Sequence, residues 1–362
     1  MAFDFAKFKS VLGISGRSKT PTQVIGVDVG ASSIKVVQLR DEKGVPTLDT
    51  YGELQLGPYG GGDIGTIVSL EQKKLTEALV DIMRESSISG NTVAFSIPYT
   101  SSFMVRMTLN TIDAEEIASR IPVEARKYIP VSLQEVSLDW IELSQDEEAK
   151  TTTLLVVAIY NEALTKMQGV LGGAGLQVVY NELEPFSAIR SVKSKNDVEA
   201  YIDFGAETTR LYIVQGGNIV GTHSLLLSGT EITNIYMSAQ SLSFKDAEER
   251  KRMIDISASD EAGVKEVDVA LRRGMKEFSN VLTRTEQELG IAIENVVCVG
   301  GGSLLLGLMP LAQEILQKNV VIGESFSKVA YPAFLDKAFK NIGPSFSVAV
   351  GLALRVFELD VE

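Results

Sequence analysis

Two short segments of the chain combine an aspartate, a glycine and small polar residues, as a phosphate-binding turn requires. The first reads DVGASS from Asp28, and the second reads DFGAETT from Asp203. Glycine and other small residues let backbone N–H groups approach a phosphate closely, and the hydroxyls supply further donors. Two aspartates at strand ends could hold the waters of one Mg²⁺ ion from opposite sides. Either segment alone is weak evidence, because Asp-x-Gly is common in ordinary turns.

Both segments lie within longer stretches that are similar to each other. The stretch VIGVDVGASSIKVVQL begins at Val24, and AYIDFGAETTRLYIVQ begins at Ala200. Each consists of an apolar strand, a short polar turn and a second strand rich in β-branched residues, a pattern that predicts a β-hairpin. The identities fall at the turn, where Asp28, Gly30 and Ala31 correspond to Asp203, Gly205 and Ala206. We therefore expect two related halves that face each other.

A third candidate is the run Gly300-Gly301-Gly302-Ser303, between a predicted buried strand over residues 296–299 and a helix. Consecutive glycines allow a planar base or a ribose to lie against bare backbone, and a helix N-terminus favours a nearby phosphate. The run lacks the spacing of the dinucleotide-binding fingerprint. A plain tight turn is the alternative interpretation.

A fourth candidate is Glu184, at a predicted junction between a strand and a helix. Pro185 follows it, and proline is favoured in the first turn of a helix. A carboxylate at such a junction would face a cleft and could orient an attacking water. The alternative is an exposed acid that the helix dipole stabilises.

Composition excludes several other classes. A chain of 362 residues suggests two or three domains. The one cysteine, Cys298, and the one histidine, His223, exclude an internal disulfide framework and a cysteine-based or histidine-rich metal site, and favour a reducing cytoplasm. The net charge of −13 argues against nucleic acid as a partner. We expect neither a signal peptide nor a transmembrane helix, because glycine and proline break both long uncharged stretches.

The predicted elements place these residues in an α/β architecture of two halves around a cleft. An acidic α+β segment is inserted into the first half. We expect a flexible basic arm (1–22), a first half (23–98), the inserted subdomain (99–179), a connecting helix of the first half (180–198), a second half (199–340, mostly helical over 228–292) and a C-terminal helix that returns to the first half (341–362).

In this order, the motifs resemble those of the actin-like ATPase superfamily, which includes actin, heat-shock chaperones and sugar kinases. Residues 28–35 and 203–209 look like its two phosphate motifs, and residues 297–303 look like its adenosine motif. Residues 184–188 and 349–353 are similar to its two connecting helices. The resemblance implies a duplicated, ribonuclease H-like fold around a nucleotide cleft.

The inserted segment resembles one family within that superfamily. The sequences EARKYIP from Glu124 and EVSLDW from Glu135 are similar to the insertion of the PilM family of type IV pilus assembly. FtsA, a relative in cell division, carries its insertion at the same position. The resemblance extends over residues 24–359, nearly the whole chain.

The resemblance implies that ATP with Mg²⁺ lies in the cleft. Asp28 and Asp203 would hold the metal through water, and Glu184 would be the candidate catalytic residue. Glu248 and Lys251 would frame the adenosine, although the residues alone predict a solvated helix face there. The implied nucleotide-binding residues are Gly30, Ala31, Ser32, Ser33, Lys35, Gly205, Ala206, Glu207, Thr208, Thr209, Gly229, Glu248, Lys251, Gly300, Gly301, Gly302 and Ser303.

The same resemblance implies an ATP-binding scaffold of the type IV pilus inner-membrane platform. Such a protein is cytoplasmic, is held near the inner membrane by its partners, and binds the N-terminal cytoplasmic peptide of PilN through its inserted subdomain. Other platform proteins and motor ATPases are further partners in that setting. Weak ATPase activity stays open. Two alternatives remain: a small-molecule kinase or phosphatase with substrate-stimulated turnover, and an FtsA-like polymerising cytoskeletal protein.

Overall fold

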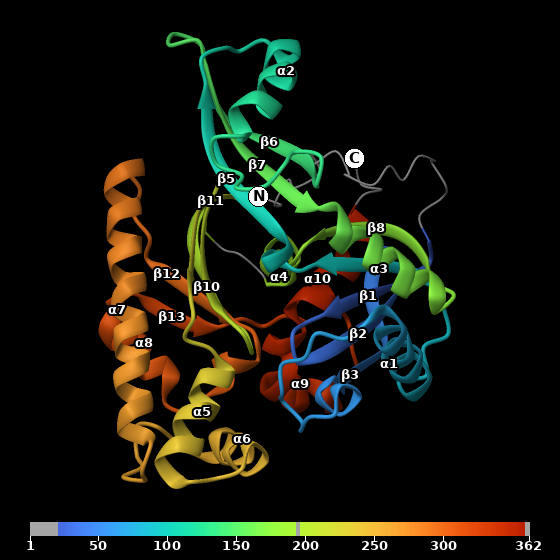
Figure 1. Cartoon of the computed structure of the whole chain (residues 1–362). Helices are drawn as coiled ribbons and strands as arrows, with labels where there is room; N and C mark the ends of the chain where they lie inside the picture. Colours follow the sequence, from blue (N-terminus) through green and yellow to red (C-terminus); the bar gives the residue numbers. More distant parts are fainter. Residues whose placement is uncertain (1–20, 193–195, 359–362) are drawn as a thin grey trace.

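Two five-stranded sheets with the same strand pattern form the two halves of the molecule (Figure 1). The computed structural model describes residues 21–192 and 196–358, so nearly all of the expected basic arm lies outside the described residues. The first sheet has the order β3-β2-β1-β4-β8, and the second has the order β11-β10-β9-β12-β13. In each sheet, three antiparallel strands are followed by two parallel ones. This confirms the predicted α/β fold of two duplicated halves.

The strands of the first sheet are β1 (Gln23–Val29), β2 (Ser33–Glu42), β3 (Val45–Gln55), β4 (Thr92–Ile97) and β8 (Gln177–Leu183). Those of the second are β9 (Val198–Phe204), β10 (Thr209–Gln215), β11 (Asn218–Leu225), β12 (Asn295–Val299) and β13 (Asn319–Ile322).

Both predicted hairpins are present and have the same geometry. In the first, the N–H of Gly30 donates to the carbonyl oxygen of Ser33 at 3.0 Å, and in the second Gly205 donates to Thr208 at 3.1 Å. Asp28 pairs in register with Lys35, and Asp203 pairs with Arg210. Residues directly opposite in an antiparallel pair point to the same face of the sheet. Each aspartate therefore has a basic residue beside it.

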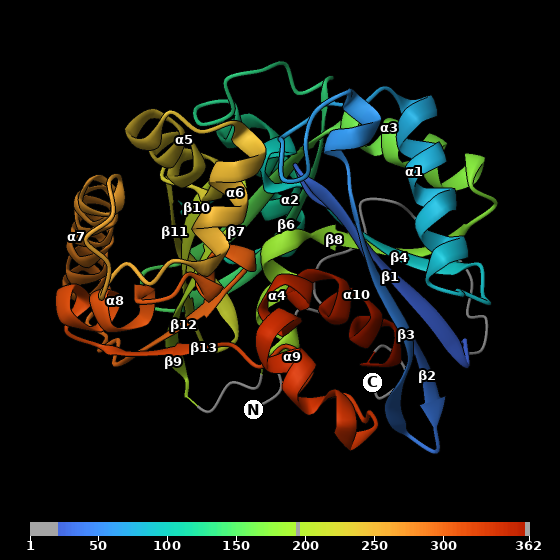
Figure 2. The same cartoon turned by 90° about the horizontal axis from the view of Figure 1, so that it is seen from below.

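Two helices cross closely in the middle of the molecule, where Figure 2 shows them side by side. They are α4 (Glu184–Ser191) and α10 (Ser347–Glu358). A side chain at Gly351 of α10 would overlap the backbone carbonyl of Ser187 in α4, so glycine is required for this approach. The C-terminal helix α10 also packs against β1 of the first sheet.

The second half carries the helices α5 (Gly229–Gln240), α6 (Phe244–Met253), α7 (Val264–Leu289) and α8 (Leu308–Leu316). The helix α9 (Asp336–Ile342) packs on the first half instead, where the ring of Phe339 lies 5.1 Å from that of Tyr51 on β3. Ser228 and Ser243 cap α5 and α6, because their side chains accept hydrogen bonds from the first-turn N–H groups of Glu231 and Asp246. The long helix α7 buries one apolar stripe and lies beside α8 on the outside of the sheet (Figure 1). These helices position the start of α5 and the face of α6 toward the first half.

A three-stranded sheet of order β5-β7-β6 projects from the two halves, at the top of Figure 1. It comprises β5 (Ser102–Leu109), β6 (Val136–Asp146) and β7 (Thr151–Tyr160), with α2 (Ala114–Ala125) packed beside it. The next helix, α3 (Asn161–Gly173), packs against α1 (Gln72–Glu85), and β8 completes the first sheet. The expected boundaries at residues 179 and 340 thus fall inside β8 and α9.

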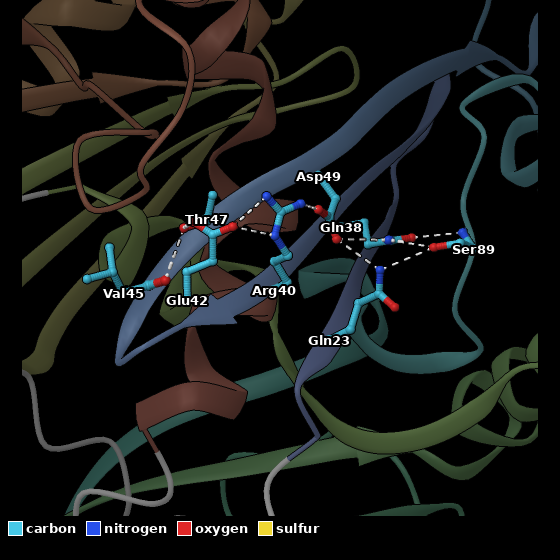
Figure 3. A network of polar contacts seen from close by, with 8 residues as sticks. All are labelled: Gln23, Gln38, Arg40, Glu42, Val45, Thr47, Asp49 and Ser89. Carbon is cyan, nitrogen blue, oxygen red and sulfur yellow. Dashed lines mark hydrogen bonds and ion pairs between the residues drawn. The ribbon is translucent and has the colours of Figure 1, made fainter.

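A polar network fixes the end of the first sheet that lies away from the hairpin turn (Figure 3). The side-chain amides of Gln23 and Gln38 both donate to Asp49 and to Ser89, at distances between 2.9 and 3.2 Å. Arg40 forms an ion pair with the same Asp49. Gln38 is buried, so these bonds satisfy amide donors that would otherwise cost free energy. The network joins β1, β2 and β3 to the segment that precedes β4.

No helix among the described residues is long and apolar enough to cross a membrane.

Candidate functional site

A cavity of about 1100 Å³ lies between the two halves. The two hairpin turns line it from opposite sides, together with the start of α5, the face of α6 and the glycine turn after β12. Every site residue predicted from the sequence lines this one cavity: Asp28, Gly30, Ala31, Ser32, Ser33, Lys35, Glu184, Asp203, Gly205, Ala206, Glu207, Thr208, Thr209, Gly229, Glu248, Lys251, Gly300, Gly301, Gly302 and Ser303.

The two aspartates are buried in the centre of the cavity wall. Burial raises the pKa of Asp28, and the hydroxyl of Ser96, which donates to its Oδ1 at 2.8 Å, opposes that shift together with Lys35. Burial also raises the pKa of Asp203; Arg210 opposes this shift and the charge of Asp28 adds to it. The carboxylates therefore repel each other, and a cation between them would remove that cost. Among the described residues, no group of three or more carboxylate, histidine or cysteine side chains is arranged to ligate a metal directly.

Glu184 is the first residue of α4, and its carboxylate faces the two aspartates. Its Oε2 accepts a hydrogen bond from the backbone N–H of Tyr99 at 3.0 Å and lies 3.6 Å from Nη1 of Arg210. Burial raises the pKa of Glu184 to about 7, and the charges of Asp28 and Asp203 add to the effect of burial, while Arg210 and the Tyr99 N–H oppose it. A carboxyl with such a pKa can accept or release a proton near neutral pH.

Lys35 and Arg210 occupy equivalent positions but have different partners. The ammonium of Lys35 donates to Oγ of Ser33 at 2.7 Å and lies 3.4 Å from Glu53, so it supports the turn of its own hairpin. Arg210 instead reaches across to Glu184 in the first half, and its guanidinium carbon lies 5.0 Å from the ring centroid of Tyr99. Neither Arg210 nor Tyr99 was predicted as a site residue. A signal for Arg210 was present, because each basic residue follows its aspartate by seven positions.

Glu248 and Lys251 of α6 form an ion pair that anchors this helix to the start of α5. Nζ of Lys251 lies 2.5 Å from Oε2 of Glu248, and it donates to the carbonyl of Gly229 and to Oγ1 of Thr233, both at 2.9 Å. Burial opposes ionisation of Glu248, but Lys251 holds its pKa below the usual range. Glu248 is only 8% exposed. The residues alone predict a solvated face here, and that interpretation is wrong because Glu248 is buried and Lys251 is half-buried at the cavity wall, where it is bonded to α5.

The glycine turn fits closely against the second hairpin. Gly300 has φ of +79°, in the left-handed region, and a Cβ there would meet the side chain of Asp203 and lie 2.6 Å from the carbonyl oxygen of Phe204. Gly301 is different, since the nearest atom to an added Cβ would be Cβ of Ser345 at 3.8 Å. Gly300 therefore permits the turn to lie beside Asp203, while Gly301 presents bare backbone to the cavity.

The cavity continues from the cleft toward the base of the inserted sheet. Pro98, Thr100 and Ser101, just before β5, line this extension of the cavity, as do Ala163 and Met167 of α3.

The chain is similar to known proteins over most of its length. A family model described as type IV pilus assembly protein PilM matches residues 26–357. The cell division protein FtsA of Bacillus subtilis is 24% identical over 378 residues, which cover 91% of this chain and 82% of FtsA.

Two solved structures support the same relationship. One chain of a PilM–PilN type IV pilus biogenesis complex is 25% identical, with a TM-score of 0.76 over 92% of this chain and 98% of that chain. MreB 5 of Spiroplasma citri, bound to AMPPNP, is 13% identical, with a TM-score of 0.53 over 94% and 96%, and supports the actin-like fold.

Proposed function

The chain belongs to the PilM family of type IV pilus assembly proteins, and we propose that it holds ATP with Mg²⁺ in the cleft between its halves and binds the N-terminal peptide of a PilN partner. The observation that carries this proposal is the convergence of both phosphate-type turns, the glycine turn and the buried carboxylates on one cavity. A nucleotide that contacts both halves would favour the conformation in which they are closed together.

The residues present fit the nucleotide and its metal. The backbone N–H groups of the two hairpin turns would bind the phosphates, since glycine and small residues leave them accessible. Asp28 and Asp203 repel each other in a buried site, and this is the environment in which a hydrated cation is favourable. Bound Mg²⁺ would neutralise part of the charge of the phosphates. Gly301 and the paired Glu248 and Lys251 would lie against the nucleoside.

Related proteins support nucleotide binding. MreB 5 of Spiroplasma citri shares the fold and has been solved with AMPPNP and with ADP. Binding does not require rapid hydrolysis, and we propose a scaffold in which any turnover through Glu184 is slow. Arg210 and the Tyr99 N–H both engage that carboxylate, which restrains it as a base.

The partner proposal is supported by the PilM–PilN complex and by the residues that line the cavity. The extension between Thr100 and Ala163 is continuous with the nucleotide cleft and reaches the base of the inserted sheet. A peptide in this extension would contact the inserted subdomain and the first half together. Through such a partner the protein would lie in the cytoplasm at the inner membrane.

Calorimetric titration with ATP tests the nucleotide site. The protein should bind ATP at one site in the presence of Mg²⁺, and chelation of the metal should weaken binding by about tenfold or more. In Asp28→Asn and in Asp203→Asn, the affinity for ATP should no longer depend on Mg²⁺, while the circular dichroism spectrum stays unchanged. Unaltered affinity in both variants would refute the site assignment.

A matched pair of variants tests the peptide site. Thr100 and Thr108 are both exposed, and both lie near or on β5, but only Thr100 lines the cavity extension. Thr100→Arg should abolish binding of a labelled peptide from the N-terminus of the PilN partner, and Thr108→Arg should preserve it. Equal affinity in the two variants would place the peptide elsewhere.

A further inference from the structure

Arg210 is a buried cation at the wall of the cleft. It is 9% exposed and lines the cavity beside the second hairpin turn. Its counterpart Lys35 is engaged with Ser33 and Glu53 of its own hairpin. Arg210 also feels the charge of Asp203 in its own hairpin, but the carboxylate with which it forms an ion pair belongs to Glu184 in the opposite half. The duplicated hairpins thus carry one basic residue that supports a turn and one that spans the cleft.

The N–H groups of the Arg210 guanidinium are available for hydrogen bonds to a ligand. Its closest approach to Glu184 is 3.6 Å, which is too long for a hydrogen bond, and its other contact is with the face of Tyr99. Within residues 21–192 and 196–358 it donates no hydrogen bond. A guanidinium carries five N–H groups in a planar fork. None of the Arg210 nitrogens is among the fully buried side-chain atoms of the described residues that lack a partner, and the residue lines the cavity. The cavity side of Arg210 is therefore suited to an anion with several oxygens.

We propose that Arg210 binds the terminal phosphate of a nucleoside triphosphate held in the cleft. This inference rests on the proposed nucleotide site. A terminal phosphate between the two hairpin turns offers several oxygens to the fork, whereas Glu184 offers one long contact. A diphosphate lacks that group and leaves Arg210 with Glu184. The residue thus distinguishes the two nucleotides, and its charge is withdrawn from Glu184 only in the triphosphate state.

Tyr99 connects this exchange to the inserted subdomain. Its ring stacks on Arg210, its N–H donates to Glu184, and its hydroxyl lies 3.4 Å from Oγ1 of Thr222 on β11. Tyr99 also stands three residues before β5, so it is the point at which the chain enters the inserted sheet. When Arg210 turns to a phosphate, Tyr99 loses one of these partners. The base of the peptide-binding extension would thereby respond to which nucleotide is bound.

The test compares AMPPNP with ADP, both with Mg²⁺, on the full chain. We expect the wild type to bind AMPPNP at least tenfold more tightly than ADP, as a charge-assisted hydrogen bond would give. Arg210→Met keeps an unbranched side chain but removes the guanidinium, and should bring the ratio to within about threefold while ADP affinity stays the same. Arg210→Lys should restore part of the ratio. Arg273→Met, at an exposed position of α7, serves as the control and should behave as the wild type.

Hydrogen exchange supplies the second readout. In the wild type, peptides that cover residues 99–109 should exchange at different rates with AMPPNP and with ADP, and Arg210→Met should remove the difference. A wild-type preference that persists in Arg210→Met overturns the inference and leaves the nucleotide site intact. A wild type that binds both nucleotides equally also overturns the inference. A wild type that binds neither overturns the proposed function itself.

Discussion

The backbone N–H of Tyr99 donates a 3.0 Å hydrogen bond to the carboxylate of Glu184, although 85 positions separate the two residues in the chain. Glu184 opens the helix that leads from the first half to the second, and Tyr99 lies just before the inserted sheet. One bond therefore joins the wall of the cleft to the base of the insertion. Since the charges of Asp28 and Asp203 also act on Glu184, the state of the cleft and the position of the insertion are physically linked.

Glu184 predicts a distinct pH dependence of stability. Its pKa is raised from 4.5 to about 7 by burial, so between these values the folded protein binds more protons than the unfolded chain. Stability therefore falls as the pH rises from 4.5 to about 7, and the full effect of this one group is at most roughly 3 kcal/mol. Thermal unfolding without nucleotide at pH 5.5 and pH 8 measures it. Glu184→Gln should reduce the difference, and the exposed Glu162→Gln should not; an equal difference in all three would contradict the assigned pKa.

The two buried aspartates should lower the stability of the nucleotide-free protein. Burial raises the pKa values of Asp28 and Asp203, and the charge of Glu53 adds to the shift of Asp28 while that of Asp28 adds to the shift of Asp203, so their charged forms are unfavourable in the empty cleft. Asp203→Asn should raise the melting temperature of the nucleotide-free protein at pH 8, and it should abolish the further rise that Mg-ATP gives to the wild type. A variant that melts lower than the wild type in both states would show that Asp203 is structural.

The glycine turn yields a matched pair of substitutions. Gly300→Ala places a Cβ against Asp203 and Phe204 at a positive φ, and should destabilise the protein by about 2 kcal/mol or more and weaken ATP binding. Gly301→Ala meets its nearest neighbour at 3.8 Å and should change the unfolding free energy by less than about 1 kcal/mol. Denaturant unfolding and ATP titration measure both effects. Similar losses in the two variants would refute the role given to Gly300.

Lys251 should be needed for both the helical subdomain and nucleotide binding. Lys251→Met leaves the buried Glu248 with only Arg252 as an ionic partner and removes two hydrogen bonds to α5, so we expect a loss of about 2–3 kcal/mol in unfolding free energy. Affinity for ATP should fall about tenfold or more, because the start of α5 lies beside the second hairpin turn. Lys245 is exposed on the same helix, and Lys245→Met is the control. No loss of affinity in Lys251→Met would remove α6 from the site.

Local repetition made much of the fold predictable. The two hairpins follow from the shared pattern around Asp28 and Asp203, since strand alternation and turn composition are local properties. The buried stripe of α7, from Val267 to Leu282, also follows from helical spacing. The strand β5 was not predicted. It was missed because its burial depends on pairing with β7 rather than on a strong alternation of its own.

The contacts between distant segments could not be predicted. The sequence predicts a strand that ends at Glu184, but nothing local shows that this strand completes the first sheet by pairing with β4. Arg210 was visible as the counterpart of Lys35, yet its partners Tyr99 and Glu184 are supplied by other elements. The spacing of Glu248 and Lys251 is that of any exposed ion pair on a helix. Its burial comes from packing against α5.

Binding of a nucleotide in the cleft should change the affinity for the peptide at the insertion, because the two sites are physically linked. The most direct measurement titrates the full chain into a labelled peptide from the N-terminus of the PilN partner, with and without saturating Mg-ATP. We expect tight binding of the peptide, with an affinity that changes by about fivefold or more when Mg-ATP is present. This factor gives the coupling free energy between the two sites. Failure of the peptide to bind in either condition, by a protein that still binds ATP, would contradict the account.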